Sequence, residues 1–316
     1  MRRLFAILLL ILALVPCARA ADGGAPLPAV GKYYVAQFDP LAVKFPDGWF
    51  LPGIRWYGLA YVAGFLIASW LMWLYARKGR LSLDADQRST LLFALILGIM
   101  LGGRLGYYIF YVILGDAGRR AEFFAHPTMI FRIWEGGMAS HGAFIGGMIG
   151  LGWFARQFKM NFFRLGDVVA TLAPPGVLIG RLANFVNGEL WGKPATVAWA
   201  MIFPVRDGGA IIGYTEPRHP SQLYEAATEG LLLLIYTQWR WWKSPPPGSP
   251  GALPAGQLAG EYLIGYAFVR IFCELFREPD APLLLGLSRG TFFSLFMILL
   301  GAALIWRARR PKITAS

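Results

Sequence analysis

Seven mostly apolar stretches, each near the length of a membrane-spanning helix, recur along this chain of 316 residues. A helix needs about 20 mainly apolar residues to cross a hydrocarbon core of about 30 Å. Runs such as 91–100 are continuously apolar, so they fit helices better than the alternating strands of a β-barrel. We therefore predict an all-α, polytopic membrane protein with about seven transmembrane helices. The predicted spans are 56–76, 91–114, 138–155, 168–182, 223–239, 258–276 and 291–306.

Residues 1–20 have the layout of a secretory signal. Two arginines precede the apolar run 4–15, and Ala18 and Ala20 follow at the spacing of a cleavage site. The alternative is a retained eighth helix, although the apolar run is short for a span. In both cases we expect the arm 21–55 to lie outside the membrane.

The net charge of +12 is better explained by membrane topology than by nucleic acid binding. If the N-terminal arm is outside, Lys and Arg are more than twice as dense in the inner segments as in the outer ones. We therefore place the basic tail 308–316 in the cytoplasm and predict no nucleic acid partner. The inner segments are 77–90, 156–167, 240–257 and 307–316.

Two connections between the spans stand out. Residues 243–257 form a Pro- and Gly-rich connector, which we expect to be flexible and cytoplasmic. Residues 187–220 form a long outer loop, in which 199–205 and 209–214 are expected to pair as a short hairpin. The chain from 56 to 307 is predicted to form one membrane domain.

Ionisable residues of the predicted spans gather near the outer ends, and each is a functional candidate or half of a structural pair. Arg181 and Asn184 are three residues apart in the fourth span. Arg270, Glu274 and Arg277 follow one another at spacings of four and three. Each set therefore shares one helical face, and Arg270 and Glu274 can neutralise each other.

Two arginines that face one cavity suit a phosphate, because the guanidinium fork binds oxyanions in a bidentate way. Arg181 has no acidic partner at helical spacing, and only Glu189 can approach it after a turn. His141 is a candidate proton acceptor, with a hydrogen-bonded helix-start histidine as the alternative. Arg104 either helps to hold a lipid head group or has a structural role, which we favour. The three histidines are widely separated, so we predict no metal site and no cofactor.

The segment 180–192 reads Gly-Arg-Leu-Ala-Asn-Phe-Val-Asn-Gly-Glu-Leu-Trp-Gly. It resembles the signature G-R-x-[GA]-N-F-x-N-x-E-x-x-G of the prolipoprotein diacylglyceryl transferases, which are bacterial membrane enzymes. The resemblance covers roughly 38–307, and the chain departs from the family in its signal-like extension, its proline-rich connector and Arg55, where histidine is expected. Further similar segments are 55–58, 136–138, 141–142, 218–225 and 276–280.

The resemblance implies transfer of a diacylglyceryl group from phosphatidylglycerol to the lipobox cysteine of a prolipoprotein signal peptide, which releases glycerol phosphate. The implied partners are phosphatidylglycerol, prolipoproteins and membrane lipids. It also implies a multi-pass protein of the bacterial inner membrane, with a cytoplasmic C-terminus and with the active site and a small segment on the periplasmic side.

The resemblance assigns roles to residues at matching positions. Arg181 and Arg270 are expected to hold the phosphate. His141 is the candidate base, with Glu274 as an alternative base or as an orienting partner of Arg270. The candidate catalytic residues are His141, Arg181, Arg270 and Glu274, and the candidate substrate-binding residues are Tyr57, Arg104, Asn184, Asn187, Glu189, Gly192, Tyr266 and Arg277.

Two other functions fit parts of the sequence. A transporter for an anionic metabolite would also use a basic intramembrane pocket, but the cytoplasmic ends of the spans carry no matching polar set. An intramembrane protease would need a serine and a histidine that face each other, whereas Ser140 and His141 are adjacent on one helix and point apart. The transferase is therefore the favoured function.

Overall fold

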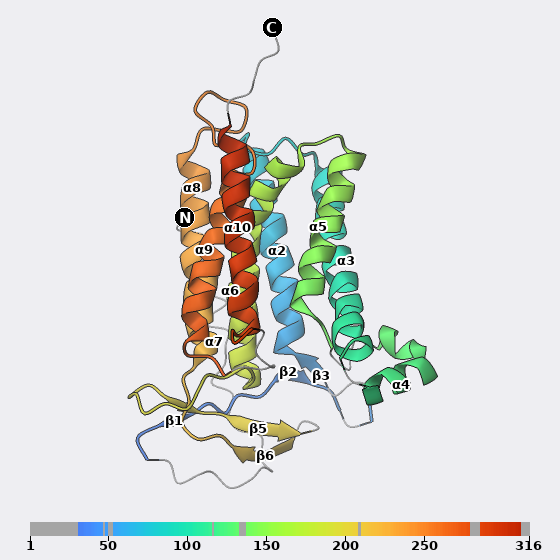
Figure 1. Ribbon diagram of the computed structural model, residues 1–316, viewed down its shortest axis with the longest axis vertical. Helices are drawn as coiled ribbons and strands as arrows, with labels where there is room; N and C mark the ends of the chain where they lie inside the picture. The colour runs from blue at the N-terminus through green and yellow to red at the C-terminus, as the bar shows by residue number, and fades with distance from the viewer. Residues whose placement is uncertain are drawn as a thin grey trace. The chain divides into compact units, whose positions relative to one another are not determined.

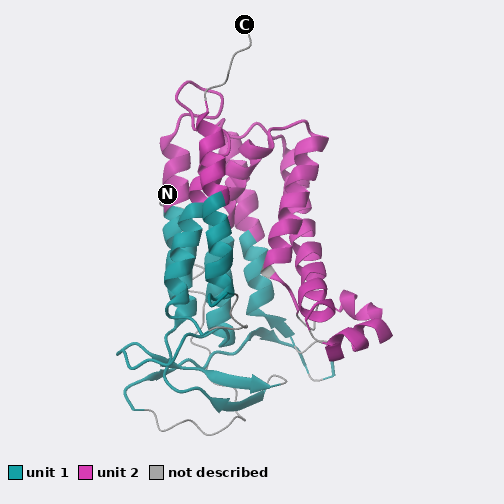
Figure 2. Cartoon of the chain, in the orientation of Figure 1, with its two compact units in different colours: residues 1–64, 174–235, 264–299 teal, residues 65–173, 236–263, 300–316 magenta. Residues whose placement is uncertain are grey.

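The computed structural model describes residues 31–46, 48–49, 53–115, 117–132, 137–207, 210–278 and 285–310. The signal-like segment 1–20, the start of the arm and residues 311–316 of the basic tail lie outside the described residues. The chain divides into two compact units, and several helices contribute to both (Figure 2). Unit 1 comprises residues 1–64, 174–235 and 264–299, and unit 2 comprises residues 65–173, 236–263 and 300–316.

Helical structure occupies each of the seven predicted stretches (Figure 1). Four helices of the described part are long and apolar enough to cross a membrane, namely α2, α3 with its continuation η1, α6 and α10. The chain is therefore a mostly helical membrane protein. The helices are α2 (Trp56–Arg77), α3 (Ala85–Tyr107), the π-helical η1 (Tyr108–Ile113), α4 (Ala117–Ala125), the 3₁₀ helix η2 (Pro127–Phe131), α5 (Ser140–Gln157), α6 (Phe162–Asn187), α7 (Ser221–Glu225), the π-helical η4 (Ala226–Leu232), α8 (Leu233–Lys243), α9 (Gln257–Glu274) and α10 (Arg289–Arg309).

Helices α3 and α5 of unit 2 pack against each other through glycines. Gly102 of α3 lies against the backbone of Gly142, and Gly98 lies against Gly146, so closely that an added Cβ would overlap a carbonyl oxygen. Small residues at such positions allow two helix backbones to approach within van der Waals distance in a membrane. The glycines therefore allow the close packing of α3 against α5.

The start of α9 is fixed by a buried carboxylate. Asp167 of α6 accepts hydrogen bonds from the backbone nitrogens of Gly256 and Ala259, each at 2.9 Å. Arg164 pairs with the same carboxylate at 3.3 Å. A negative charge at a helix N-terminus is favourable because the first amide groups of a helix lack intrahelical acceptors.

A small group of strands belongs to unit 1. The structure confirms a hairpin in the loop after α6, but its first strand is shorter than predicted, because 201–202 pairs with β1 instead. The hairpin therefore excludes residues 199–203. The strands are β1 (Tyr34–Val35) parallel to β4 (Met201–Ile202), β2 (Leu41–Lys44) antiparallel to β3 (Gly53–Arg55), and β5 (Pro204–Asp207) antiparallel to β6 (Ala210–Tyr214).

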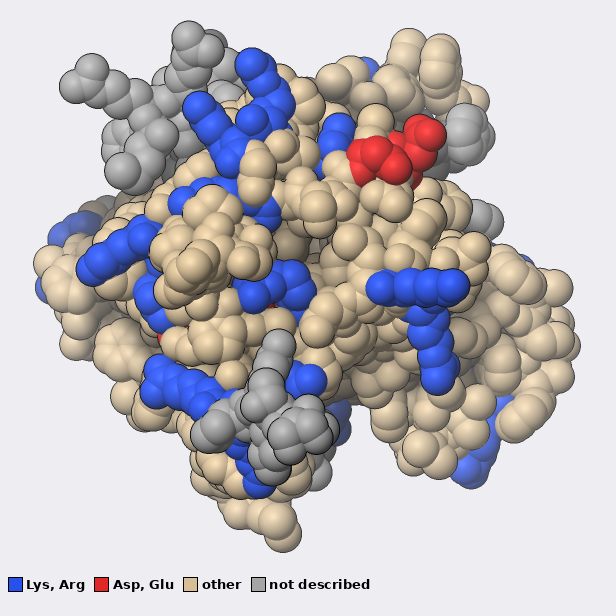
Figure 3. All heavy atoms as spheres, turned by 90° about the horizontal axis from the view of Figure 1, so that it is seen from above, with Lys and Arg blue, Asp and Glu red and all other residues tan. Residues whose placement is uncertain are grey.

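One face of the molecule is strongly basic. Seen from above, Lys and Arg side chains are spread over it, whereas Asp and Glu form one small group (Figure 3). Several cations of unit 2 lie over aromatic rings, a contact in which the ring face attracts positive charge. These cations are Arg77, Arg80, Lys243, Arg307 and Arg310.

Candidate active site

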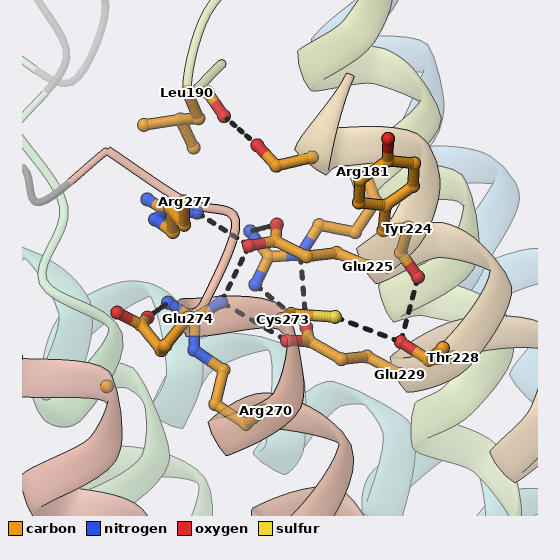
Figure 4. A network of polar contacts seen from close by, with 12 residues as sticks. Arg181, Leu190, Tyr224, Glu225, Thr228, Glu229, Arg270, Cys273, Glu274 and Arg277 are labelled. Atoms are coloured by element: carbon orange, nitrogen blue, oxygen red, sulfur yellow. Dashed lines mark hydrogen bonds and ion pairs between the residues drawn. The ribbon is translucent and has the colours of Figure 1, made fainter. Parts of the chain in front are cut away.

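Two arginines from different helices share one pair of buried glutamates in unit 1 (Figure 4). Arg181 of α6 lies 3.0 Å from Glu225 and 2.9 Å from Glu229, measured between side-chain nitrogen and oxygen atoms. Arg270 of α9 lies 2.9 Å from Glu225 and 3.1 Å from Glu229. The two glutamates thus hold both guanidinium groups in one place.

The same group extends to three further side chains. Arg277 lies 2.9 Å from Glu225, Arg270 also pairs with Glu274 on its own helix, and the Tyr266 hydroxyl donates to Glu229 at 3.3 Å. We call Arg181, Glu225, Glu229, Arg270, Glu274 and Arg277 the arginine–glutamate cluster. Its three positive and three negative charges balance, and this compensation is what allows so many ionised groups to be buried together.

Local geometry explains why the glutamates reach the arginines. Glu225 ends α7 and Glu229 lies four residues later in η4, so both side chains emerge on one side of the helix. Gly230 lies against the backbone of Leu178, where any Cβ would overlap the Leu178 Cα. This close approach of η4 to α6 brings Glu229 beside Arg181.

Arg181 and Arg270 are the most exposed members of the cluster. Their side chains are 18% and 13% exposed, whereas those of Glu225 and Glu229 are 0% exposed. A ligand that reaches the cluster therefore meets these two arginine side chains before the two glutamates. Such fixed, partly desolvated donors suit an oxyanion.

Two sequence predictions about ion pairs have opposite outcomes. The pairing of Arg270 with Glu274 is confirmed. The prediction that Arg181 lacks an acidic partner is wrong, because its partners come from another helix and not from helical spacing on α6. Glu189, the one neighbour considered, instead accepts hydrogen bonds from Asn184 at 2.7 Å and from Asn187 at 3.3 Å.

The turn after α6 is built around Glu189. Gly188 and Leu190 have φ values of 68° and 58°, so the chain reverses through two left-handed residues. The Gln222 side chain donates to the Glu189 carbonyl at 2.7 Å, which fixes this turn to α7. Asn184 and Asn187, in the last turn of α6, are therefore held against the Glu189 side chain.

Gly192 occupies a position that excludes any side chain. Its backbone pairs with that of Arg277, and its nitrogen donates to the His219 carbonyl at 2.9 Å. A Cβ at Gly192 would overlap the Phe276 carbonyl oxygen and the backbone of His219. The glycine thus joins the signature segment to the end of α9, next to Arg277.

Burial lowers the pKa of His219 below its ordinary value, which favours the neutral imidazole.

The other candidate residues lie outside the cluster. The Tyr57 hydroxyl lies 3.2 Å from that of Tyr61, in unit 1. His141 is the second residue of α5, and Arg104 lies in α3, both in unit 2. Arg104 donates to the carbonyl oxygens of residues 129, 130, 132 and 137, at distances from 2.7 to 3.1 Å. This guanidinium ties a loop to its helix, as the favoured structural role predicts.

The sequence reasoning missed the two residues that organise the site. Glu225 is included only within the family-like segment 218–225, and Glu229 is not singled out. A signal was present, because two carboxylates four residues apart inside an apolar stretch are costly unless cations compensate them.

Comparison with known proteins identifies the family of this chain. A family model described as prolipoprotein diacylglyceryl transferase matches residues 49–307. The chain is similar to proteins named phosphatidylglycerol–prolipoprotein diacylglyceryl transferase from Aeromonas hydrophila and Pseudoalteromonas atlantica, with 39% and 41% identity over 90% of this chain and 95% of each relative. A protein of the same name from Photobacterium profundum is 43% identical over 83% of this chain and 92% of its own length.

Proposed function

Because the chain belongs to the prolipoprotein diacylglyceryl transferase family, we propose that it transfers the diacylglyceryl group of phosphatidylglycerol to a cysteine thiol of prolipoproteins. This reaction begins the maturation of bacterial lipoproteins. The observation that carries the proposal is that Arg181 and Arg270, from two helices, are brought together by the same glutamates.

The reaction is a substitution at a glycerol carbon of the lipid. The cysteine sulfur forms a thioether bond to this carbon, and the bond from carbon to the phosphate oxygen breaks. The bonding electron pair leaves with the phosphate group as glycerol phosphate, and a base accepts the thiol proton. Catalysis therefore requires a cationic site for the leaving phosphate and a proton acceptor near the thiol.

Arg181 and Arg270 serve as the cationic site. Their guanidinium groups approach the shared glutamates from different helices, so little reorganisation is needed when negative charge develops on the leaving oxygen. Arg277 adds a third guanidinium on Glu225 and contributes to the head-group pocket.

His141 is the proposed base, and Glu274 is the proposed orienting partner of Arg270. The contact of Glu274 with Arg270 supports this division, because it places the carboxylate where it orients that guanidinium. Histidine is the side chain that most often serves as a general base, so His141 is assigned to accept the thiol proton.

The remaining candidate residues are assigned to the substrate. The Asn187 Oδ1 atom is buried and accepts no hydrogen bond from the described residues, which suits a hydroxyl of the glycerol head group. Tyr266 contacts Glu229 and lies beside the arginines. The other residues proposed to shape the lipid pocket are Tyr57, Asn184, Glu189 and Gly192.

The proposed topology has seven spans in the domain 56–307 and a signal-like segment 1–20 that is cleaved or retained. The high density of Lys and Arg in the predicted inner segments supports a cytoplasmic location for the connector 243–257 and the tail 308–316. The arm 21–55 and the loop 187–220 are then periplasmic, where a lipobox cysteine at the outer end of a signal peptide becomes available.

The proposal is tested with the purified full chain, phosphatidylglycerol and a lipobox peptide. Mass spectrometry of the peptide is expected to show the added diacylglyceryl mass, and free glycerol phosphate is expected in equal amount. A Cys→Ser peptide is the control and should stay unmodified. Absence of the thioether product with the unaltered chain would refute the proposed transferase activity.

A further inference from the structure

We propose that the buried glutamates of the arginine–glutamate cluster limit the positive charge of the site so that glycerol phosphate can leave after the transfer. The inference rests on the proposed function, because it concerns the product of that reaction. It assigns Glu225 and Glu229 a role as positioning residues that act through the arginines, without contact with the lipid.

The leaving group carries more charge than the lipid from which it comes. The phosphodiester of phosphatidylglycerol has one negative charge, whereas a phosphate monoester has a second pKa near 6 and carries about −1.5 to −2 charges at pH 7. A site with a large excess of positive charge therefore binds the product more tightly than the substrate. Such a site would promote cleavage but retain the product.

Glutamates offset the positive charge of each arginine in the cluster. Every guanidinium of the cluster lies within 3.1 Å of at least one glutamate oxygen, and Arg270 contacts three glutamates. The fully buried carboxylates are not screened by water, so they weaken the field of the arginines strongly. Arg181 and Arg270 are the most exposed members of the cluster, so a lipid phosphate reaches these two side chains before the buried carboxylates.

Three arginines paired with three carboxylates have a net charge of zero, whereas three arginines alone carry only positive charge. At zero net charge, the guanidinium donors can still hold the single negative charge of the lipid phosphate. The additional negative charge of glycerol phosphate then strengthens binding only weakly. Loss of one carboxylate gives the cluster a net charge of +1 and shifts the preference towards the dianion.

The test measures product affinity in Glu229→Gln, which keeps the side-chain shape and removes one charge. Isothermal titration of the purified full chain with glycerol phosphate is expected to show about tenfold tighter binding than in the unaltered protein. Steady-state assays are expected to show a lower kcat, an unchanged or lower KM for phosphatidylglycerol and stronger product inhibition. Glu229→Asp, which retains the charge, should keep a product affinity near that of the unaltered chain.

The matched control is Glu261→Gln. Glu261 also accepts hydrogen bonds from an arginine, Arg240, at 2.6 and 2.8 Å, but it belongs to unit 2 and not to the cluster. Its loss should leave glycerol phosphate affinity unchanged. If Glu229→Gln does not fold, Glu274→Gln makes the same charge change at Arg270 and takes its place in the titration.

Equal or weaker glycerol phosphate binding in the folded charge-removing variant would overturn the inference, as would a rise in KM with weaker product inhibition. Those results are the ones that a purely structural role for the glutamates predicts. Failure of the inference is distinguishable from failure of the proposed function, because the titration needs no turnover, whereas the peptide assay does.

Discussion

Two groups of buried charges, one in each unit of the molecule, are satisfied in different ways. In unit 2, Asp167 receives two backbone amide hydrogens at the start of α9, and Arg104 donates to four backbone carbonyl oxygens. In unit 1, Arg181 and Arg270 contact carboxylate side chains from another helix. The backbone partners fix a loop or a helix end, whereas the carboxylates fix other charged groups.

This difference separates structural charges from candidate catalytic charges. A charge bound by backbone groups completes hydrogen bonds that the fold itself requires, so its loss destabilises the protein. A guanidinium held by carboxylates stays ionised and oriented, and it can exchange part of its contacts for a phosphate. We therefore expect substitutions of Arg181 and Arg270 to affect activity first, and those of Asp167 and Arg104 to affect stability first.

The largest expected effect comes from Arg181→Ala, which should lower diacylglyceryl transfer about a hundredfold to a thousandfold, the range found when a single oxyanion donor is removed. It also leaves Glu229 with fewer compensating charges, so the protein should become less stable while still inserting into the membrane. Activity is measured with the lipobox peptide, and stability by thermal unfolding in detergent. Combining Arg181→Ala with Glu229→Gln should recover stability without recovering activity, and recovery of activity would contradict the role of Arg181.

A smaller effect, on stability, is expected for Asp167→Ala. Two buried backbone amides lose their acceptor, which should lower the free energy of unfolding by about 3 kcal/mol. The fraction that stays folded should retain normal turnover. A selective loss of turnover at unchanged melting temperature would break the proposed distinction between the units.

The smallest effect is expected for Asp84→Ala, because this aspartate also binds a backbone amide but is exposed. Its side chain accepts from the Gln87 nitrogen at 2.8 Å and caps α3. Loss of an N-cap lowers stability by about 1 kcal/mol. Comparing the thermal unfolding of Asp84→Ala with that of Asp167→Ala shows how much burial adds to the loss of stability. Equal shifts in melting temperature for the two variants would refute a contribution from burial.

The sequence was sufficient to predict the helical stretches and the arginines of the site. Continuous apolar runs identify the helices, and charges inside such runs are rare enough to attract attention, as with Arg181 and Arg270. Helical spacing also predicted the pair of Arg270 and Glu274.

Contacts between distant segments could not be derived in this way. The partners of Arg181 are set by the packing of η4 on α6 at Gly230, and no local rule specifies that contact. The predicted start of the hairpin, at residue 199, was wrong for a similar reason, because the pairing of Met201 with Tyr34 depends on a strand that is distant in the sequence. The backbone carbonyl oxygens that accept hydrogen bonds from Arg104 could not be predicted either, because every residue type carries the same carbonyl group.

The central claim is that Arg181 acts on the phosphate and does not merely hold the fold together. Its most direct test is Arg181→Lys, assayed for diacylglyceryl transfer and for melting temperature in the same preparation. Lysine keeps the positive charge beside Glu225 and Glu229 but lacks the bidentate fork. The account predicts a melting temperature close to that of the unaltered protein with transfer reduced at least about tenfold, and transfer at the unaltered rate would contradict it.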